Sequence, residues 1–564
     1  MRPFFKSKKD SSGDSNQNHD KNEQPSEFNM PETPLSKYLD VNVQMIKEMT
    51  GDSSDIIIRR LDQVLGKPVH VAVIYTDGLA DEQIINNSIL KSLTQIQADA
   101  DGSLDPPKQV LGWIKHRFLA IGQVTDIDTM KKLFDAILAG NTVILVDGTA
   151  KGISASSAGG EQRGVDEPQS QTVIRGPREG FTENLRVNTS LIRRKIKNPN
   201  LWIVDRTIGR VTQTDVAVMY IHGIASDDVV QEILRRLDRI DIDSVLESGY
   251  IEEFIQDATF TPFPTLTNSE RPDAIAGAIL EGKVAIIVDG SPFVLIAPIT
   301  IFKLFQSSED YYQKFDIATF LRLMRIIAFV FSMLLPSMYI AITTFHQQML
   351  PTTLLISLAA QREGVPFPAF VEALAMEITF EVLREAGVRM PRAIGSAISI
   401  VGALVLGQAA VQAGLVSAAM VIIVAFTAIA GFVAPSVSLS NSARLLRFGF
   451  MLLAATLGLF GIIAGLMAML IHLSGLRSFG IPYLIPLAPF SPSDQKDALV
   501  RVPWWAMLKR PTLISKKTSN AKNQSKNHRH RMMNKSSEHP DQTKRWKRCS
   551  GDWALCFSYC RSRC

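Results

Sequence analysis

The chain has 564 residues, of which 46% are hydrophobic and 20% charged, and its formal net charge is +5. These averages combine a charged region over the first 320 or so residues, an apolar region from Ile326 to Ile471, and a basic tail from Ser515 to Cys564. The tail holds thirteen Lys and Arg against three Asp and Glu, together with all four cysteines. The rest of the chain is therefore net negative. Because all four cysteines lie in the tail, the rest of the chain has no disulfide or thiolate-metal framework. Its net negative charge gives no support to nucleic-acid binding.

The first 40 residues are rich in Ser, Asn, Asp, Lys, Glu and Pro and too poor in apolar residues to bury a core. We therefore predict a disordered tail over residues 1–40. Its first residues are basic but no apolar segment follows them, so no cleaved signal peptide is predicted.

An internal repeat organises the region that follows. The segments Val69–Leu93 and Val216–Leu237 each contain a β-branched run, a glycine turn and an amphipathic helical pattern. The segments Ile137–Ala150 and Ile279–Pro292 each end in a continuous apolar strand that stops at Asp-Gly. Continuous apolar strands flanked by helices predict α/β layers. We predict two similar α/β subdomains, at residues 41–170 and 201–312, with these features in equivalent positions: Gly78 and Gly223, and Asp147 and Asp289.

The Asp-Gly turn of the first repeat invites comparison with a phosphate loop. Asp147–Gly152 follows a strand but matches neither GxxxxGK[ST] nor GxGxxG. The folded part also lacks HExxH, GxSxG and any His/Cys cluster with metal spacing. The sequence predicts no enzyme, no cofactor and no metal site there.

Residues 171–200 link the two predicted subdomains. A turn at Gly176, Pro177 and Gly180 precedes the segment Glu183–Lys197, which has the pattern of a basic amphipathic helix. Three interpretations are open for this helix: a solvated interdomain helix, a contact with a membrane surface or partner, and packing on the acidic face of a neighbour.

A transmembrane domain of four to five spans is predicted at residues 320–490. Ala393–Ala443 contains no Asp, Glu, Lys or Arg, which at about 20 residues per crossing is long enough for two helices. Such a segment is either helical in a bilayer or buried in a very large protein, and we favour the bilayer. The predicted spans are Phe320–His346, Ile394–Gln412, Val416–Ala434 and Phe448–Ile471.

The positive-inside rule orients these spans. Arg322 and Arg325 at the start of the first span predict a cytoplasmic amino-terminal region. Four spans return the segment 491–514 and the tail 515–564 to the same side. Arg444 and Arg447 would then lie outside, so a fifth crossing or re-entrant segment between Met349 and Gly387 is an alternative.

Small residues recur within these spans. Ser399, Ala403 and Gly407 form one stripe, and Gly461 and Gly465 form a GxxxG pair. Both patterns are typical of closely packed helices.

The segment Pro368–Gly387 predicts an apolar helix with a narrow acidic stripe, formed by Glu377, Glu381 and Glu385. Carboxylates at bilayer depth face water, a cation or a partner, and rings of Glu attract cations. One interpretation is therefore an ion pathway. The other is a solvent-facing stripe paired with Arg384, Arg389 or Arg392.

Two glutamines and the tail cysteines complete the candidate residues. Gln408 and Gln412 are further ion-pathway candidates, with an ordinary interhelical hydrogen bond as the alternative. Cys556, Cys560 and Cys564 recur every fourth residue near three tail histidines, and we interpret this as incidental rather than as a metal site.

Three long motifs carry a family resemblance: RGPREGFTENLRVN at 175–188, LPTTLLISLAAQREGVPFPAFVEALAMEITFEVLREAGVRMP at 350–391, and PLAPFSPSDQKDALVRVPWWAMLKRP at 486–511. In this order they resemble the A subunit of bacterial spore germinant receptors of the GerA/GerB/GerK type. The resemblance covers roughly residues 41–512, and the last 50 residues depart from the family pattern. The family motif residues, structural or coupling, are Arg175, Gly176, Pro177, Arg178, Glu179, Gly180 and Phe181.

The resemblance implies a multi-pass protein of the spore inner membrane, with the amino-terminal domain and carboxyl terminus on the cytoplasmic side. It implies partnership with a permease-like B subunit and a lipoprotein C subunit, contact with membrane lipid, and a homo-oligomer that is a candidate for ion conduction. Small nutrients would trigger ion release and germination. The alternative is a membrane-anchored scaffold or ligand-binding α/β protein without ion conduction. No nutrient-binding residues carry over, because the family's nutrient pocket is attributed mainly to the B subunit.

Overall fold

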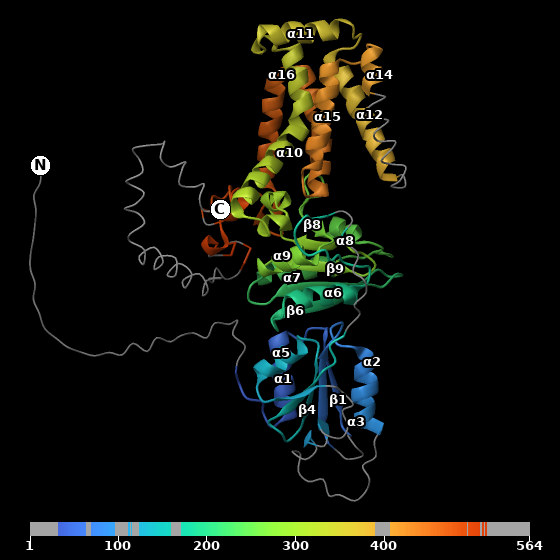
Figure 1. Ribbon diagram of the computed structural model, residues 1–564, viewed down its shortest axis with the longest axis vertical. Helices are drawn as coiled ribbons and strands as arrows, with labels where there is room; N and C mark the ends of the chain where they lie inside the picture. The colour runs from blue at the N-terminus through green and yellow to red at the C-terminus, as the bar shows by residue number, and fades with distance from the viewer. Residues whose placement is uncertain are drawn as a thin grey trace, which may run out of the picture.

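The computed structural model describes residues 32–63, 69–95, 111–112, 114–115, 123–159, 168, 171–389, 407–492, 494–507, 510–511 and 514–515. Two α/β subdomains are stacked end to end, and a bundle of helices extends from the second one (Figure 1). The predicted tails 1–31 and 516–564, with all four cysteines, lie outside the described residues, and so do Ser399 and Ala403.

Subdomain 1 is built on a five-stranded antiparallel sheet of order β1-β2-β4-β5-β3. Its main elements are α1 (Leu39–Thr50), β1 (Ile56–Leu61), β2 (Val71–Thr76), α2 (Glu82–Ile84), η1 (Ile85–Leu90), α3 (Lys91–Gln95), β3 (Val124–Ile127), α5 (Met130–Ile137), β4 (Thr142–Val146) and β5 (Gly152–Ala155).

The central strands of subdomain 1 are apolar throughout because helices cover both faces of the sheet. On β2, Val71 and Val73 pack with Ile89 of η1, while Ala72 and Ile74 belong to the core formed with α1 and α5. A continuous apolar run is typical of parallel strands. Here the same pattern occurs in an antiparallel sheet. The continuous apolar run indicates that both faces of the strand are buried, whatever the direction of its neighbours.

Subdomain 2 repeats this architecture with the strand order β6-β7-β9-β10-β8. Its elements are α6 (Leu185–Lys195), β6 (Leu201–Ile208), β7 (Thr214–Ile221), α7 (Asp227–Leu237), α8 (Ser248–Ile255), β8 (Thr267–Ser269), α9 (Pro272–Leu280), β9 (Val284–Val288) and β10 (Val294–Ala297). Because strands β1–β5 and strands β6–β10 are arranged in the same order in their sheets, the repeat in the sequence is a repeat of fold.

The equivalent positions make equivalent contacts. The N–H of Leu39 donates to Asp147 Oδ1 at 2.9 Å, and the N–H of Leu185 donates to Asp289 Oδ1 at 3.0 Å. Each Asp-Gly carboxylate thus binds the first backbone amide of a helix, a standard way to satisfy a helix terminus. The N–H of Gly148, in the first of these turns, donates to the carbonyl of Lys37 at 2.9 Å.

Two segments differ from the sequence-based interpretation. Helix α6 is not a solvated interdomain helix, because seven of its eleven residues are buried and it occupies in subdomain 2 the place that α1 occupies in subdomain 1. The predicted disordered tail over residues 1–40 is wrong at its end, because Leu35 and Leu39 are 4% and 6% exposed in the core of subdomain 1.

Short helices connect subdomain 2 to the bundle, and a carboxyl-terminal segment packs against them. The connecting helices are η3 (Ile301–Phe305) and η4 (Ser308–Tyr311). The carboxyl-terminal segment contains β11 (Arg477–Ser478), β12 (Ile481–Pro482), α17 (Gln495–Ala498) and η7 (Trp504–Ala506).

The bundle contains α10 (Phe315–Thr344), η5 (Gln347–Met349), α11 (Thr352–Glu363), α12 (Ala369–Arg389), α14 (Gly407–Gln412), α15 (Ala418–Phe432) and α16 (Val437–Gly475). Among the described residues, α10 and α16 are long and apolar enough to cross a membrane by length and composition, and α15 is a shorter apolar helix. Helix α12 runs alongside α15, while α11 lies across the end remote from the subdomains (Figure 1).

Helix α16 turns back on itself in the middle. Gly458 has φ 62° and ψ −140°, which is not helical. Ser442 and His472 both bond to adjacent residues of subdomain 2, Pro262 and Thr261. A straight helix would separate two residues 30 apart by about 45 Å. The predicted single helix Phe448–Ile471 is therefore two antiparallel helical arms joined at Gly458.

The GxxxG pair lies where the two arms of α16 meet. A Cβ on Gly461 would lie 2.2 Å from the carbonyl O of Leu453, and one on Gly465 would lie 2.8 Å from side-chain atoms of Phe450 and Leu453. The small residues thus allow the arms to approach closely, as predicted for this pattern.

Candidate functional site

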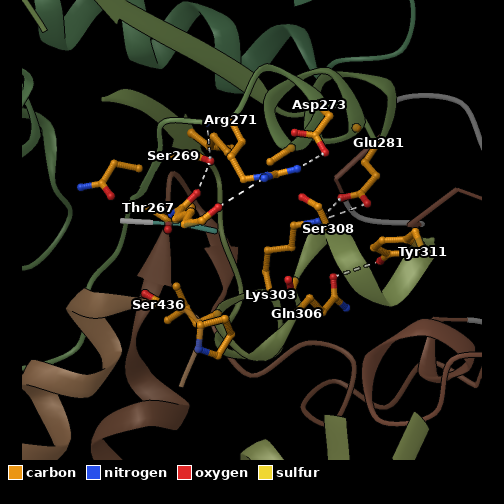
Figure 2. Close-up of a pocket in the computed structure, with 18 of the residues that line it drawn as sticks. Thr267, Ser269, Arg271, Asp273, Glu281, Lys303, Gln306, Ser308, Tyr311 and Ser436 are labelled. Atoms are coloured by element: carbon orange, nitrogen blue, oxygen red, sulfur yellow. Dashed lines mark hydrogen bonds and ion pairs between the residues drawn. The ribbon is translucent and has the colours of Figure 1, made fainter. Parts of the chain in front are cut away.

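A cleft of about 1220 Å³ lies where subdomain 2, the bundle and the carboxyl-terminal segment meet (Figure 2). Its walls come from β8 and α9, from η3 and η4, from the turn between α15 and α16, and from α17 and η7. Three parts of the chain that are distant in sequence therefore share one cavity, and any ligand or movement there would act on all three.

One wall of the cleft contains a cluster of polar residues centred on Arg271, which is 3% exposed. Its guanidinium donates to Asp273 Oδ2 at 2.8 Å and to the carbonyl of Pro177 at 2.9 Å. The hydroxyl of Tyr312 donates to the same carboxylate oxygen at 2.5 Å. Burial and this hydrogen bond raise the pKa of Tyr312, so the phenol stays protonated and remains a donor.

The predicted family motif, residues 175–181, contacts Arg271 and Tyr312 of this wall. Gly176 has φ 143°, and a Cβ there would come within 2.7 Å of the Tyr312 ring. A side chain at this position therefore clashes with an aromatic ring as well as straining the backbone. Of the seven motif residues, Arg175, Gly176, Pro177, Arg178 and Glu179 are exposed, and Gly180 and Phe181 are buried. The motif thus connects α6 to the wall of the cleft.

A second wall of the cleft holds Glu281 between two lysines. The carboxylate lies 2.8 Å from Lys283 Nζ and 3.4 Å from Lys303 Nζ. Burial alone would raise the pKa of Glu281, but the charges of Lys283 and Lys303 outweigh it and lower that pKa to about 2. Burial lowers the pKa of Lys283 to about 8, against the attraction of Glu281.

The base of α10 is joined to α17 by a buried ion network. Arg322 is 0% exposed and lies 3.4 Å from Asp310 and 3.3 Å from Asp497, and Arg325 Nη1 lies 2.7 Å from Asp310. The hydroxyl of Tyr311 donates to Asp497 Oδ2 at 2.8 Å. Of the two arginines interpreted as topology signals, Arg322 therefore attaches α10 to the carboxyl-terminal segment, and Arg325 attaches it to η3 and η4.

Within the bundle, α12 carries three carboxylates that each bind a different part of the neighbouring helices. Glu372 Oε1 accepts from the N–H and the hydroxyl of Ser417, at 2.6 and 2.5 Å, and so caps the start of α15. Glu377 Oε2 lies 2.5 Å from Arg447 Nη1, and Glu381 pairs with Arg444. This carboxylate ladder, Glu372, Glu377 and Glu381, spans ten residues, or about 13.5 Å along α12.

Arg447 also repairs a break in α10. Pro336 has no N–H to donate to the carbonyl of Ser332, the acceptor four residues earlier. Arg447 Nε donates to that carbonyl at 2.7 Å while Nη1 holds Glu377. One guanidinium, 3% exposed, therefore joins α16 to both α10 and α12.

The structure separates the predicted ion-pathway residues. Glu377 and Glu381 point to arginines of α16 in the same chain, whereas Glu385 is exposed and pairs with Arg389. Gln408 and Gln412 are exposed on α14. The solvent-facing alternative describes Glu385 but not the other two carboxylates, whose partners are Arg447 and Arg444 rather than Arg384 or Arg392.

The sequence analysis did not identify Glu372 as a member of this ladder, nor Arg444 and Arg447 as its partners. Two carboxylates four residues apart on α12 and two arginines three residues apart on α16 match in helical spacing. This matching spacing is the feature of the sequence from which the pairing could have been predicted. The segments are about 65 residues apart, so only their packing identifies them as partners.

Comparisons with known proteins place this chain in a family. The family model described as Bacillus/Clostridium GerA spore germination protein matches residues 44–513. Spore germination protein KA of Bacillus subtilis (strain 168) is 53% identical over 86% of this chain and 88% of its own length. Spore germination protein GerLA of Bacillus cereus is 40% identical over 84% of this chain and 95% of its own length.

A solved structure is also similar. It is the crystal structure of the N-terminal domain of the A subunit of the Bacillus megaterium spore germinant receptor GerK3. It is 41% identical and covers 48% of this chain and 98% of the solved chain, with a TM-score of 0.39. From the family match over most of its length and its identity to curated relatives, this chain belongs to the Bacillus/Clostridium GerA family of spore germination proteins.

Proposed function

We propose that this protein is the A subunit of a nutrient germinant receptor in the spore inner membrane, where it couples nutrient sensing to ion release and the start of germination. Membership of the GerA family and identity to spore germination proteins support this role. The subunit works with a permease-like B subunit and a lipoprotein C subunit, and its subdomains and carboxyl terminus face the cytoplasm. No step of this role requires catalysis by the chain.

The carboxylate ladder of α12 is the observation that carries the ion-release part of the proposal. Charged groups inside a bilayer are costly, by at least about 2.5 kcal/mol each on insertion scales, and they mark ion pathways when they occur. In a homo-oligomer, α12 would bring Glu377, Glu381 and Glu385 toward a shared cation path, with Gln408 and Gln412 at its mouth. Arg444 and Arg447 neutralise two of these carboxylates at rest, and separation of α12 from α16 frees them.

Spores carrying substituted receptors test this proposal. The Glu381→Gln/Glu385→Gln chain should slow nutrient-triggered cation release without reducing the amount of protein in the membrane, because Gln keeps the volume and removes the charge. Glu377→Gln is combined with Arg447→Gln, so that no unpaired arginine is left buried. Glu253→Gln, at an exposed site on α8, is the matched control. Parental release rates in all of these spores, at normal protein levels, would contradict the ion path.

The cleft favours a second candidate function, a ligand-binding or scaffold subunit that conducts no ions. Its volume suits a small molecule, and its walls join the subdomains to the bundle. Cation flux into liposomes containing the purified oligomer separates the two candidates. Flux that is lost in Glu381→Gln/Glu385→Gln supports conduction, and absence of flux with ligand-dependent protection of the cleft supports the second candidate.

A further inference from the structure

An exposed apolar patch lies on the carboxyl-terminal segment beside the base of α10. Trp504 and Trp505 of η7 are 63% and 58% exposed, and Val500 just before them is 47% exposed. Leaving a large apolar side chain in water forgoes about 1.5–3 kcal/mol of burial. Three such residues within six positions indicate a surface that is covered in the working protein.

Hydrogen bonds fix the height of this patch on α10. The hydroxyl of Thr319 donates to the carbonyl of Arg501 at 3.1 Å, and the N–H of Arg501 donates back to it at 3.2 Å. Thr319 is the fifth residue of α10. The patch is therefore attached to the first turns of a helix that is apolar enough to span a bilayer.

The first turns of α10 also carry exposed apolar side chains. Phe320 is 62% exposed, and Leu323, Met324 and Ile327 are 41%, 43% and 45% exposed. Their i, i+3, i+4 and i+7 spacing places them on one face of the helix. This stripe begins one residue after Thr319, so Arg501, three residues before Trp504, lies at the level where the apolar face starts.

The tryptophans are held by packing beneath them. Arg501 is 2% exposed, and its guanidinium lies 5.3 Å from the centre of the Trp504 ring and 5.9 Å from that of Tyr311. The Tyr311 and Trp504 rings are 5.8 Å apart. Stacking of an arginine on aromatic faces orients Trp504. Tyr311 also bonds to Asp497, so the patch is connected to the buried network at the base of α10.

We infer that Trp504 and Trp505 anchor the carboxyl-terminal segment in the lipid–water interface. An indole has a large apolar ring and one N–H donor, which suits the boundary between hydrocarbon and headgroups, where tryptophan is enriched. The anchor sets the depth of η7 and, through Arg501 and Asp497, keeps one wall of the cleft at the membrane surface. The inference rests on the membrane location proposed above.

The depth of a spin label tests the anchor in the full chain. Cys549, Cys556, Cys560 and Cys564 are changed to Ser, and single cysteines are introduced as Val500→Cys, Ile327→Cys and Val211→Cys. Val211 is 78% exposed on subdomain 2 and reports the aqueous value. The labelled chains are reconstituted in liposomes of phosphatidylethanolamine and phosphatidylglycerol. Accessibility to oxygen, which concentrates in hydrocarbon, is compared with accessibility to a water-soluble nickel chelate.

The expected ratio of oxygen to nickel accessibility at Val500→Cys lies between those at Ile327→Cys and Val211→Cys. Adding Trp504→Ala and Trp505→Ala should shift it toward the Val211→Cys value. An aqueous ratio at Val500→Cys, with a hydrocarbon ratio at Ile327→Cys, would overturn the anchor alone. Low accessibility to both reagents would show a protein cover instead and would also overturn it. An aqueous ratio at Ile327→Cys would overturn the membrane location itself.

Discussion

At the scale of single residues, the contact between the two subdomains depends on a buried ion pair. Arg193 of α6 and Asp55, just before β1, have side chains 1% and 4% exposed. Two parallel bonds of 2.8 and 2.9 Å join them, which is the bidentate geometry that favours arginine. Removing one partner leaves the other charge buried without compensation, and that loss is larger than the net contribution of the pair.

Substituting Arg193→Leu should therefore destabilise the subdomain contact by roughly 3–5 kcal/mol. The thermal unfolding midpoint of the detergent-solubilised full chain measures the change, and Arg193→Leu combined with Asp55→Leu should recover much of it. Arg210→Leu is the matched control, because Arg210 and Asp241 form an exposed pair. Equal shifts in Arg193→Leu and Arg210→Leu would refute the assignment.

The low pKa of Glu281 predicts that the folded protein loses stability in acid. Its pKa is about 2 in the folded protein against an ordinary value of 4.5. Between these values the unfolded chain binds more protons than the folded chain, so stability rises with pH through this window. The contribution of Glu281 is complete above about pH 4.5 and is lost as the pH falls toward 2. Its full size is about 3 kcal/mol.

Unfolding midpoints of the parent and Glu281→Gln chains between pH 6 and about 3 test this linkage. The parent should lose stability more steeply than the variant as the pH falls. Parallel curves would show that the lysines do not hold Glu281 in its charged form in the folded protein.

At the scale of elements, the fold-back of α16 depends on glycines that no other residue replaces without strain. Gly458 combines a positive φ with contacts of 2.8 Å from a built Cβ to His346 and 3.0 Å to Phe345. Gly461 faces the backbone of Leu453. The two arms can pack only if these positions carry no side chain.

We expect Gly461→Ala to lower the unfolding midpoint of the solubilised chain by several degrees, since overpacking costs about 1–3 kcal/mol. Gly449→Ala, in the first arm, is the control, because a Cβ there meets nothing within 4 Å. If both alanine variants behave alike, the arms are not packed as the structure shows.

At the scale of the whole molecule, the path of the bundle explains two arginines that conflicted with the predicted topology. Four spans place Arg444 and Arg447 opposite the subdomains. In the structure, Ser442 bonds to Pro262 of subdomain 2, so the start of α16 lies at the subdomain end of the bundle. Tyr483, after α16, donates to the carbonyl of Pro264 and lies at that end too. The helix that carries Arg444 and Arg447 therefore starts at the subdomain end, and Arg447 reaches the carbonyl of Ser332 in the middle of α10. These arginines are partners of the α12 carboxylates within the bundle rather than markers of the opposite side.

Labelling of introduced cysteines in a chain lacking its four native ones tests this arrangement. An impermeant maleimide added to intact cells should label Gln361→Cys, exposed on α11, and not Val211→Cys on subdomain 2. Both sites should react after permeabilisation. External labelling of Val211→Cys would invert the proposed orientation.

The sequence by itself determined what depends on local patterns: the repeat of two α/β subdomains, the apolar region, the close-packing glycines and the acidic face of α12. Hydrophobic periodicity and composition are properties of residues that are neighbours in the sequence, so they can be recognised before the fold is known. Only the tertiary structure decided the partners, such as Glu377 with Arg447, Asp55 with Arg193, and the carbonyl freed by Pro336 with a guanidinium 115 residues away. It also decided that α6 is a core element and that Gly458 divides α16. Each of these depends on which surfaces meet, because a buried charge or an unpaired carbonyl is stable only beside a partner that the chain brings from elsewhere.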